Sequence, residues 1–323
     1  MRLIKLFPLL LVGSLVSCNQ SNFVIESKVF CFDTVIEYKL YEGEESYKTD
    51  IDNLFNYYDI LADNYRLRDN IINVSAINKT NEEVIVDESL YKMLKASFST
   101  HEFDANNFNP LCGSLVKLWK DSLAKGELLS NEVITSELDK INNSSLLFKD
   151  NNVIQRVGDA ELDLGGIAKG YVLDKIEEYL KANNLTHYLI NAGFSSILLG
   201  EKDTSDGYFS VGVDSRILAN SYLKLKNCFV STSSITEQGV KLTKDGPTYS
   251  HIINPLDGSA INKHDAVIVI SNKGYLGDAL STSMMNNTID EIKEMETKYN
   301  VKCIVVDNKT VTYKNTELEV YHH

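Results

Sequence analysis

Leu162-Asp163-Leu164-Gly165-Gly166-Ile167-Ala168-Lys169-Gly170 is the stretch that decides the fold class. Leu173, Ile176 and Leu180 follow at helical spacing, so the stretch predicts a strand, a glycine turn and an amphipathic helix. Three glycines let the backbone approach a ligand closely, and N–H groups at a helix start favour phosphate. The glycine spacing fits neither a Walker A motif nor a dinucleotide fingerprint. From these residues alone, a nucleotide-binding turn and a turn whose glycines serve packing are both open.

Short strands and helices are predicted on both sides of this turn, with a polar stretch at 140–152. β-branched and aromatic runs predict strands at 30–41, 187–191, 208–213, 223–230, 266–271 and 302–307. Apolar residues at helical spacing predict helices at 51–63, 90–100, 116–123, 170–183, 277–285 and 290–299. The order predicts an α+β (mixed α/β) fold, a single compact domain with mixed sheets flanked by helices.

Composition excludes one large class of function. The chain has 323 residues, of which 43% are hydrophobic, so it can bury a sizeable core. Its net charge of −13 argues against a nucleic-acid partner, because phosphate backbones are bound by clustered Lys and Arg. The same acidity is compatible with a metal ion that carries an anionic ligand.

The N-terminus has the features of an export signal. Arg2 and Lys5 precede an apolar run at 6–16, which is too short to span a bilayer as a helix. The run ends in Leu15-Val16-Ser17-Cys18, which resembles a bacterial lipobox. We therefore expect a lipoprotein signal peptide at 1–18, acylation of Cys18, a tether at 19–28 and a functional domain at 29–323. That domain would lie outside the cytoplasm, anchored to a bacterial membrane by lipid. An ordinary secretory signal and an apolar first helix are the alternatives.

The remaining cysteines form no recognisable metal motif. None is in a Cys-x-x-Cys pair and no His lies at zinc-like spacing, so a structural zinc site is not expected. Free buried thiols are the default expectation, and a disulfide outside the cytoplasm stays open. These cysteines are Cys31, Cys112, Cys228 and Cys303.

Asp278 and Thr282 lie four residues apart in Gly277-Asp278-Ala279-Leu280-Ser281-Thr282. On a helix their oxygens point the same way. A carboxylate and a hydroxyl are hard ligands that suit Mg²⁺, which completes its octahedron with waters and phosphate oxygens. A helix N-cap aspartate beside a surface threonine is the structural alternative.

Two further segments have residues that suit phosphate or proton chemistry. His251 lies in Tyr249-Ser250-His251-Ile252-Ile253-Asn254-Pro255-Leu256-Asp257-Gly258, whose end has turn composition. Val230-Ser231-Thr232-Ser233-Ser234 is a hydroxyl cluster at a strand end. A structural histidine and a simple strand terminus are the alternatives.

In this order and spacing, the four segments resemble the FAD:protein FMN transferases of the ApbE family, once described as thiamine-biosynthesis lipoproteins. The family's Asp-Leu-Gly-Gly-Ile-Ala-Lys-Gly matches completely at 163–170, and its Ala-Asp-Ala-x-x-Thr corresponds to 277–282. The N-terminal half agrees more loosely. Residues 32–34 occupy the position of the family's Met-Gly-Thr, and residues 108–113 resemble its Phe-Asp-Pro-x-x-Gly segment. This sequence departs from the family motifs at several positions, for example with Phe194 in place of the second glycine of Asn-x-Gly-Gly. These departures cluster around the part of the site that would bind the isoalloxazine ring of FAD.

The resemblance implies an enzyme, with 29–323 as its flavin transferase domain and FAD as its substrate. It would transfer FMN to a Ser or Thr hydroxyl of an extracytoplasmic acceptor protein and release AMP, with Mg²⁺ bridging the pyrophosphate. The Gly166 carbonyl, Asp278 and Thr282 would hold the metal. His251 would be the catalytic base, since an unperturbed histidine titrates near neutral pH. FAD would contact Phe32, Tyr65, Asn107, Phe108, Asn109, Asp163, Lys169 and Ile252.

Two alternatives use the same residues. In a Mg²⁺-dependent FAD pyrophosphatase, water would replace the acceptor hydroxyl and free FMN and AMP would result. A flavin-binding lipoprotein would bind FAD without turnover, although FAD storage does not require a metal at the pyrophosphate.

Overall fold

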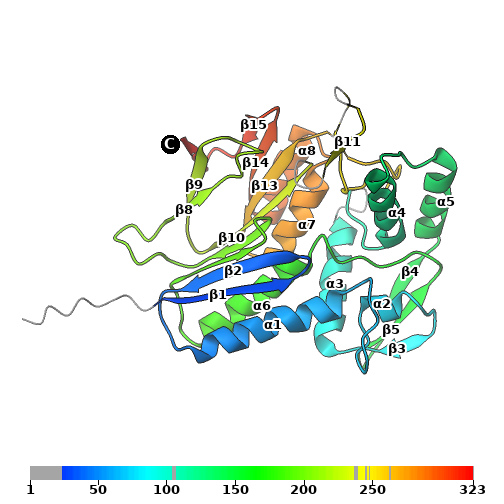
Figure 1. The fold of residues 1–323 in the computed structure, drawn as a ribbon, viewed down its shortest axis with the longest axis horizontal. Coiled ribbons are helices and arrows are strands. Elements are labelled where there is room, and N and C mark those ends of the chain that lie inside the picture. Colours follow the sequence, from blue (N-terminus) through cyan, green and yellow to red (C-terminus); the bar gives the residue numbers. More distant parts are fainter. Residues whose placement is uncertain are drawn as a thin grey trace, which may run out of the picture.

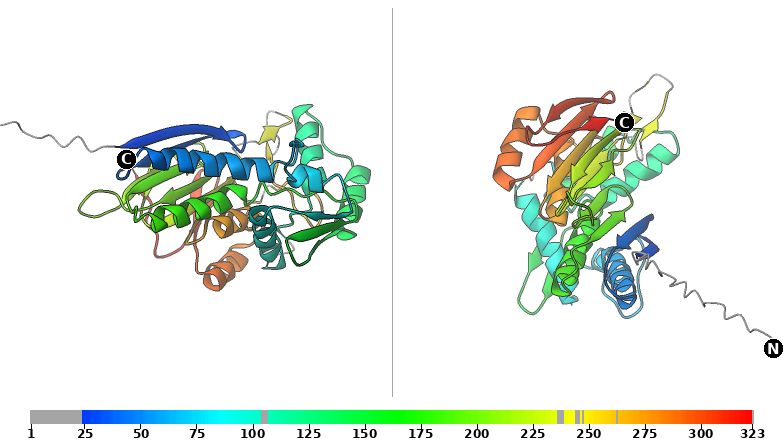
Figure 2. Two further views of the ribbon diagram at one scale, coloured as in Figure 1. Left: turned by 90° about the horizontal axis from the view of Figure 1, so that it is seen from below. Right: turned by 90° about the vertical axis from the view of Figure 1, so that its left-hand side faces the viewer.

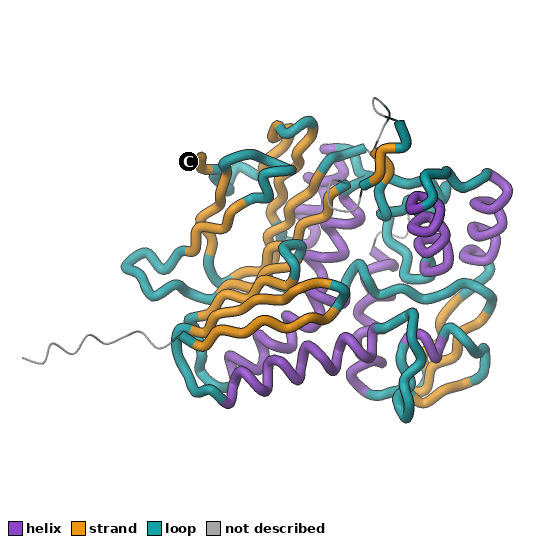
Figure 3. The backbone as a smooth tube through the Cα atoms, viewed as in Figure 1, coloured by secondary structure: helices purple, strands orange, loops and turns teal. Residues whose placement is uncertain are grey.

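The computed structural model describes residues 24–103, 107–235, 239–243, 246, 248–261 and 263–322. Its helices are α1 (Ser46–Ala62), α2 (Val74–Ile77), α3 (Glu88–Phe103), α4 (Gly113–Ala124), α5 (Asn131–Asn142), α6 (Ala168–Ala182), α7 (Gly274–Met284) and α8 (Ile289–Tyr299). Its strands are β1 (Ile25–Cys31), β2 (Thr34–Leu40), β3 (Glu83–Ile85), β4 (Ser145–Phe148), β5 (Val153–Val157), β6 (Tyr188–Ala192), β7 (Ser196–Leu199), β8 (Phe209–Gly212), β9 (Ser221–Leu225), β10 (Cys228–Ser234), β11 (Val240–Lys241), β12 (Thr248–Tyr249), β13 (Ala266–Ser271), β14 (Lys302–Asp307), β15 (Thr310–Lys314) and β16 (Tyr321–His322). Figure 3 shows most of the long strands side by side in one half of the molecule, whereas the small sheet β3-β5-β4 lies at the other end with α4 and α5.

The central element is an eight-stranded sheet in the order β1-β2-β6-β7-β10-β13-β14-β15. The predicted α+β class is confirmed. The expected mixed sheets are not observed, because every strand pair among the described residues is antiparallel. The physical reason is local connection: β1–β2, β6–β7 and β14–β15 are hairpins, and short hairpin turns can join only antiparallel strands.

The two faces of this sheet are covered differently. Helices α1 and α6 lie side by side along one face, which α7 and α8 continue to cover (Figures 1 and 2). The other face packs, at β10, β13 and β14, against the small sheet β16-β9-β8. Strand β13 is therefore buried on both faces along its whole length. The ends of β7 and β10 thus lie between a helical layer and a second sheet.

Two predicted strands are in fact pairs of strands. The segment 30–41 contains the end of β1, a turn at Phe32 and Asp33, and β2. Both turn residues have positive φ, 52° and 54°, as hairpin turns that match the sheet twist require. The segment 223–230 likewise contains the end of β9, a turn at Asn227 with φ 49°, and the start of β10.

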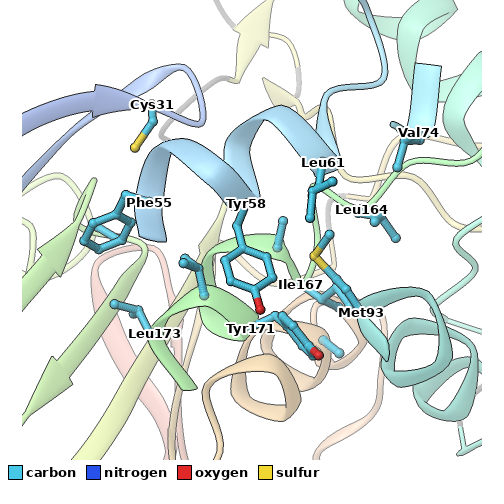
Figure 4. Packing of buried hydrophobic residues seen from close by; sticks show 14 of the residues in the cluster. Cys31, Phe55, Tyr58, Leu61, Val74, Met93, Leu164, Ile167, Tyr171 and Leu173 are labelled. Carbon is cyan, nitrogen blue, oxygen red and sulfur yellow. The ribbon is translucent and has the colours of Figure 1, made fainter. Parts of the chain in front are cut away.

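The glycine turn at 162–170 is held by its apolar residues. Leu164 and Ile167 are buried beneath α1, beside Val74 and Met93 (Figure 4). The Asn78 side chain hydrogen-bonds both backbone polar groups of Leu162, where the turn begins. Asn78 Oδ1 accepts from Leu162 N at 2.7 Å, and Asn78 Nδ2 donates to Leu162 O at 2.9 Å. The turn therefore enters α6 in a fixed position.

Gly170 allows α6 and α7 to touch. A Cβ built on Gly170 would overlap the carbonyl oxygen of Gly274, and one built on Gly274 would overlap that of Gly170. The Gly170 N–H also donates to Asp278 Oδ2 at 2.7 Å. Part of the glycine motif is therefore explained by helix packing.

Gly170→Ala is expected to lower the free energy of unfolding by about 1–3 kcal/mol, because the added methyl forces two packed helices apart. Gly212→Ala is the matched control, since a Cβ there meets nothing within 4 Å. Chemical denaturation of both variants measures the difference. Equal stability of the two would contradict the assigned contact between α6 and α7.

Two sequence-level questions are answered within the described part of the chain. Free buried thiols, the default expectation, are found at Cys31, Cys112 and Cys303, whereas Cys228 is a free thiol that is only partly buried. Among the same residues, no helix is both long and apolar enough to cross a membrane. Cys18, the signal peptide and residues 19–23 of the expected tether lie outside the described residues, and residues 25–28 belong to β1.

Candidate functional site

One cavity of about 550 Å³ collects the residues that the sequence singled out. It lies where the ends of β7 and β10 meet the glycine turn, α7 and the loops after α1 and α3. Every candidate site residue except Cys18 lines it: Phe32, Tyr65, Asn107, Phe108, Asn109, Asp163, Gly166, Lys169, His251, Ile252, Asp278 and Thr282. Residues 250 positions apart in sequence thus share one space.

Asp163 shapes the turn that it begins. Its Oδ1 accepts from Gly165 N at 2.6 Å, and its own N–H donates to Pro110 O at 2.8 Å. A Cβ on Gly165 would lie 2.9 Å from that same carboxylate oxygen, so a larger residue there would displace the Asp163 side chain. The carboxylate therefore closes the loop that presents Gly166 to the cavity.

Asp278 is a buried carboxylate with three hydrogen-bond donors. Its Oδ1 accepts from Ser196 Oγ at 2.8 Å and from Ser231 Oγ at 2.6 Å, and its Oδ2 accepts from Gly170 N. Burial raises the pKa of the Asp278 carboxyl to about 6, against the opposing effects of the Ser231 hydroxyl and the nearby Lys169 ammonium. The contacts on Oδ1 occupy both of its lone pairs, which leaves one lone pair on Oδ2 for a ligand.

Thr282 lies one helical turn beyond Asp278. Its hydroxyl donates to the Asp278 carbonyl oxygen at 3.1 Å, so its oxygen lone pairs are not used in that contact. Ser233 Oγ lies 3.3 Å from Thr282 Oγ1, and a Cβ on Gly166 would lie 3.8 Å from the same atom. The glycine turn and α7 therefore meet at Thr282.

The donor set here fits Mg²⁺ better than a transition metal. Among the described residues, no three His, Cys, Asp or Glu side chains group closely enough to hold a metal ion. The available donors are the carbonyl of Gly166, the carboxylate of Asp278 and the hydroxyl of Thr282. Hard oxygen donors in this small number suit a Mg²⁺ ion that takes its other ligands from phosphate and water.

His251 is enclosed next to two lysines. Burial lowers the pKa of the His251 imidazole to about 4, and the positive charges of Lys120 and Lys169 act in the same direction. Its Nδ1 atom is shielded from solvent and has no hydrogen-bond partner among the described residues. The imidazole is therefore neutral at pH 7, and its titration in this ligand-free form lies well below neutrality.

Aromatic side chains also line the cavity. Phe32 is held by its N–H, which donates to Asp59 Oδ1 at 2.7 Å. Tyr65 is 55% exposed, and its ring lies 4.9 Å from Lys117 Nζ. A ring this open, with a lysine on one face, leaves its other face for a flat ligand.

Cys112 also lines the cavity but is a poor nucleophile. Burial raises the pKa of its thiol to about 12, and the charge of Asp163 acts in the same direction. Only the thiolate attacks efficiently, so covalent catalysis by this cysteine is excluded at neutral pH.

Sequence reasoning missed two participants. Ser196, on β7, holds the Asp278 carboxylate, and no motif contains it. Lys120, on α4, is the second positive charge near His251. Ser231 belongs to the hydroxyl cluster noted in the sequence, and its partner Asp278 emerges only from the fold. Ser196 and Ser231 face each other across β7 and β10, so strand pairing was the missing signal.

Known proteins share sequence and fold with this chain. A FAD:protein FMN transferase of Klebsiella pneumoniae (strain 342) is 25% identical to this chain, over 82% of this chain and 85% of that protein. One of Treponema pallidum (strain Nichols) is 28% identical over 62% of this chain and 60% of that protein. The crystal structure of an ApbE protein from Thermotoga maritima shares the fold, with a TM-score of 0.77 at 24% identity, over 91% of this chain and 98% of that chain. The sequence model of the ApbE family matches residues 32–305. Since that match spans most of its length, this chain belongs to the ApbE family.

Proposed function

We propose that this protein transfers FMN from FAD to a Ser or Thr hydroxyl of an acceptor protein, in a Mg²⁺-dependent reaction that releases AMP. Its family supports this, because the relatives compared above are named FAD:protein FMN transferases. The observation that carries the proposal is the meeting of Gly166, Lys169, Asp278 and Thr282 in one cavity of about 550 Å³. That volume suits a single cofactor-sized ligand.

FAD would lie with its flavin among the aromatic residues and its pyrophosphate at the glycine turn. Phe32, Tyr65, Phe108 and Ile252 offer apolar and aromatic surface for the isoalloxazine ring. Asn107 and Asn109 line the same cavity and would offer polar contacts to FAD. Lys169 and the backbone around Asp163 would contact the phosphates, because positive charge and N–H groups at a helix start favour anions.

The metal ligands would be the Gly166 carbonyl, Asp278 and Thr282. We assign Asp278 Oδ2 as the coordinating oxygen, since Ser196 and Ser231 already occupy the lone pairs of Oδ1. Bound there, Mg²⁺ offsets negative charge on the pyrophosphate.

The transfer step requires a nucleophile and a proton acceptor. The acceptor hydroxyl oxygen forms a bond to the phosphorus of the FMN half, and the bond between that phosphorus and the bridging oxygen breaks. AMP leaves with the bonding electron pair. The hydroxyl proton goes to His251, whose imidazole is neutral in the ligand-free protein. Positioning and charge stabilisation dominate such phosphoryl transfer.

The direct test is to incubate the protein with FAD and Mg²⁺ and measure AMP, with EDTA as the control. Mass spectrometry of extracytoplasmic proteins, with and without the enzyme, then looks for a covalent FMN adduct. AMP and free FMN without an adduct would identify a pyrophosphatase. Bound FAD without AMP would identify a flavin-binding lipoprotein and contradict the proposal.

We also propose that the domain is held outside the cytoplasm by a lipid on Cys18, motivated by Leu15-Val16-Ser17-Cys18. Cys18→Ser is expected to move the protein from the membrane to the soluble fraction, while the purified domain keeps its activity. Fractionation and mass spectrometry of the mature N-terminus measure this. An unmodified Cys18 in membrane-extracted protein would rule the anchor out.

A further inference from the structure

A second, smaller cavity of about 60 Å³ adjoins the first. Its floor is apolar and belongs to the core between the main sheet and the sheet β16-β9-β8: Ile197, Val211, Ile217, Leu223, Val230 and Ile268. No step of the proposed reaction uses it.

Three residues line both cavities, namely Ser195, Thr232 and Ser234. Their neighbours in sequence contact the proposed metal ligands: Ser196 donates to Asp278, and Ser233 lies 3.3 Å from Thr282 Oγ1. Successive strand residues point to opposite faces of a sheet. The small cavity therefore lies just across β7 and β10 from the part of the large cavity where the pyrophosphate would be bound.

The Ser195 hydroxyl at this junction has no hydrogen-bond partner in the part of the chain that the structure describes. Its Oγ is shielded from solvent and makes no hydrogen bond with any described residue. Buried hydroxyls are normally paired, so an unpaired one between two cavities indicates a ligand that completes it.

The rim of the small cavity is open on one side. Phe194 forms part of it and is 72% exposed, with φ 65°. Asp214 and Arg216 lie on the rim and neutralise each other, with 3.0 Å between Arg216 Nε and Asp214 Oδ2. An apolar opening without net charge favours an aliphatic group over an ion.

We propose that this small cavity is an acceptor subsite, which binds an aliphatic side chain of the acceptor polypeptide next to the residue that receives FMN. The inference rests on the proposed function. The large cavity accommodates one cofactor-sized ligand, so the residues that flank the acceptor hydroxyl must bind outside it. The acceptor subsite is the apolar cavity that shares its wall with the pyrophosphate region. Ser195 would hydrogen-bond the acceptor segment as it crosses between the two cavities.

The size of the acceptor subsite limits its occupant. A water molecule requires about 10–15 Å³ of such volume, so about 60 Å³ admits a side chain of a few carbons and no aromatic ring. Each added carbon in a fitted apolar pocket changes selectivity by roughly tenfold or more.

The test uses synthetic peptides with a central Thr and one flanking position varied at a time among Gly, Ala, Val, Leu, Phe, Asp and Lys. With FAD and Mg²⁺, FMN-labelled peptide and AMP are both measured. At one flanking position, the wild-type protein is expected to prefer an aliphatic residue over Gly, Asp and Phe by at least about tenfold. Equal use of all residues at every position would overturn the subsite.

Val211→Phe fills the acceptor subsite and is expected to raise the KM for the preferred peptide at least about tenfold, with a less than threefold change in the KM for FAD. Val157→Phe, on β5 and 40% exposed, is the matched control and should leave both values unchanged. If Val211→Phe fails to fold, Phe194→Ala on the exposed rim must raise the peptide KM instead. If the folded Val211→Phe variant keeps the wild-type preference for an aliphatic flanking residue, the subsite is refuted.

The outcomes also separate this inference from the proposed function. Labelled peptide without any aliphatic preference overturns the subsite and leaves the transferase intact. AMP release without labelled peptide overturns both the subsite and the transferase, because it identifies water as the acceptor. If neither AMP nor labelled peptide is formed, the proposed function itself is overturned.

Discussion

Asp278→Ala is expected to reduce FMN transfer by at least about 10³-fold, the scale that charge-stabilising groups contribute to phosphoryl transfer. The variant removes the single carboxylate of the proposed metal site. It also leaves the donors of Gly170, Ser196 and Ser231 without their acceptor, which costs about 1–3 kcal/mol for each buried group left unpaired. Activity loss and stability loss must therefore be measured separately.

Calorimetric titration of Mg²⁺ into each variant separates the two effects. Glu296→Gln is the matched control, because Glu296 is also a buried carboxylate with backbone and side-chain donors, and it does not line the cavity. It is expected to lower stability and leave Mg²⁺ binding intact. Thr282→Val should weaken Mg²⁺ binding less than Asp278→Ala, since a neutral hydroxyl contributes less than a carboxylate. Wild-type turnover by Asp278→Ala in limiting Mg²⁺ would show that the metal lies elsewhere.

The parts of the site that could be predicted from sequence have short-range signatures. The pair Asp278 and Thr282 shares a helix face at a spacing of four, and the turn at 163–170 shows itself by its glycines. The aromatic contacts came from resemblance alone. The cavity then joins all of these residues, which no local pattern could establish. Ser196 shows the limit: an isolated serine in a strand has no signature until β7 pairs with β10.

The two turns that were missed within predicted strands share a physical cause. Positive φ is adopted by residues other than glycine in the hairpin turn at Phe32 and Asp33, and in the turn at Asn227 that leads from one sheet to the other. Glycine in a sequence is a strong signal for a turn with positive φ, whereas asparagine or aspartate is a weaker signal. Helix α5 was missed for a different reason: it is polar on most sides, with only Glu137 and Ile141 buried. Its start depends on the Ser130 side chain, which accepts from Val133 N.

Phe194 is the departure from the family pattern with the clearest structural consequence. It stands where the family has glycine, and its φ of 65° is one that side chains of this size rarely adopt. The neighbouring residue Gly193 lets the turn lie close to Thr34, because a Cβ on Gly193 would overlap the Thr34 side chain. The hairpin β6–β7 therefore keeps its turn and places an exposed ring at the acceptor subsite.

His251→Ala is expected to slow FMN transfer at saturating FAD by at least about 10²-fold, because a positioned base contributes roughly 10²–10⁴-fold. The imidazole has an unpartnered Nδ1 and lines the cavity with Lys169. FAD affinity should change much less than the rate. If His251 serves only to bind phosphate, the variant will instead raise the KM for FAD and keep the full rate at saturation.

The pH profile tests the same role independently. A histidine titrating near pH 6.5 would place the acid limb of the rate near neutrality, but the pKa of His251 is lowered to about 4 in the ligand-free protein. The limb of kcat/KM, which reports the free enzyme, is therefore expected near pH 4, and His251→Ala should lack it.

FAD binding should move that limb upward. The pyrophosphate brings negative charge beside the imidazole, opposes the effect of Lys120 and Lys169, and favours the protonated form. The limb of kcat, which reports the complex, should therefore lie at higher pH than that of kcat/KM. Rate measurements from about pH 2.5 to 8, at limiting and saturating FAD, determine both. Coinciding limbs would mean that the phosphates do not lie next to His251, and the assigned direction of FAD in the cavity would have to be reversed.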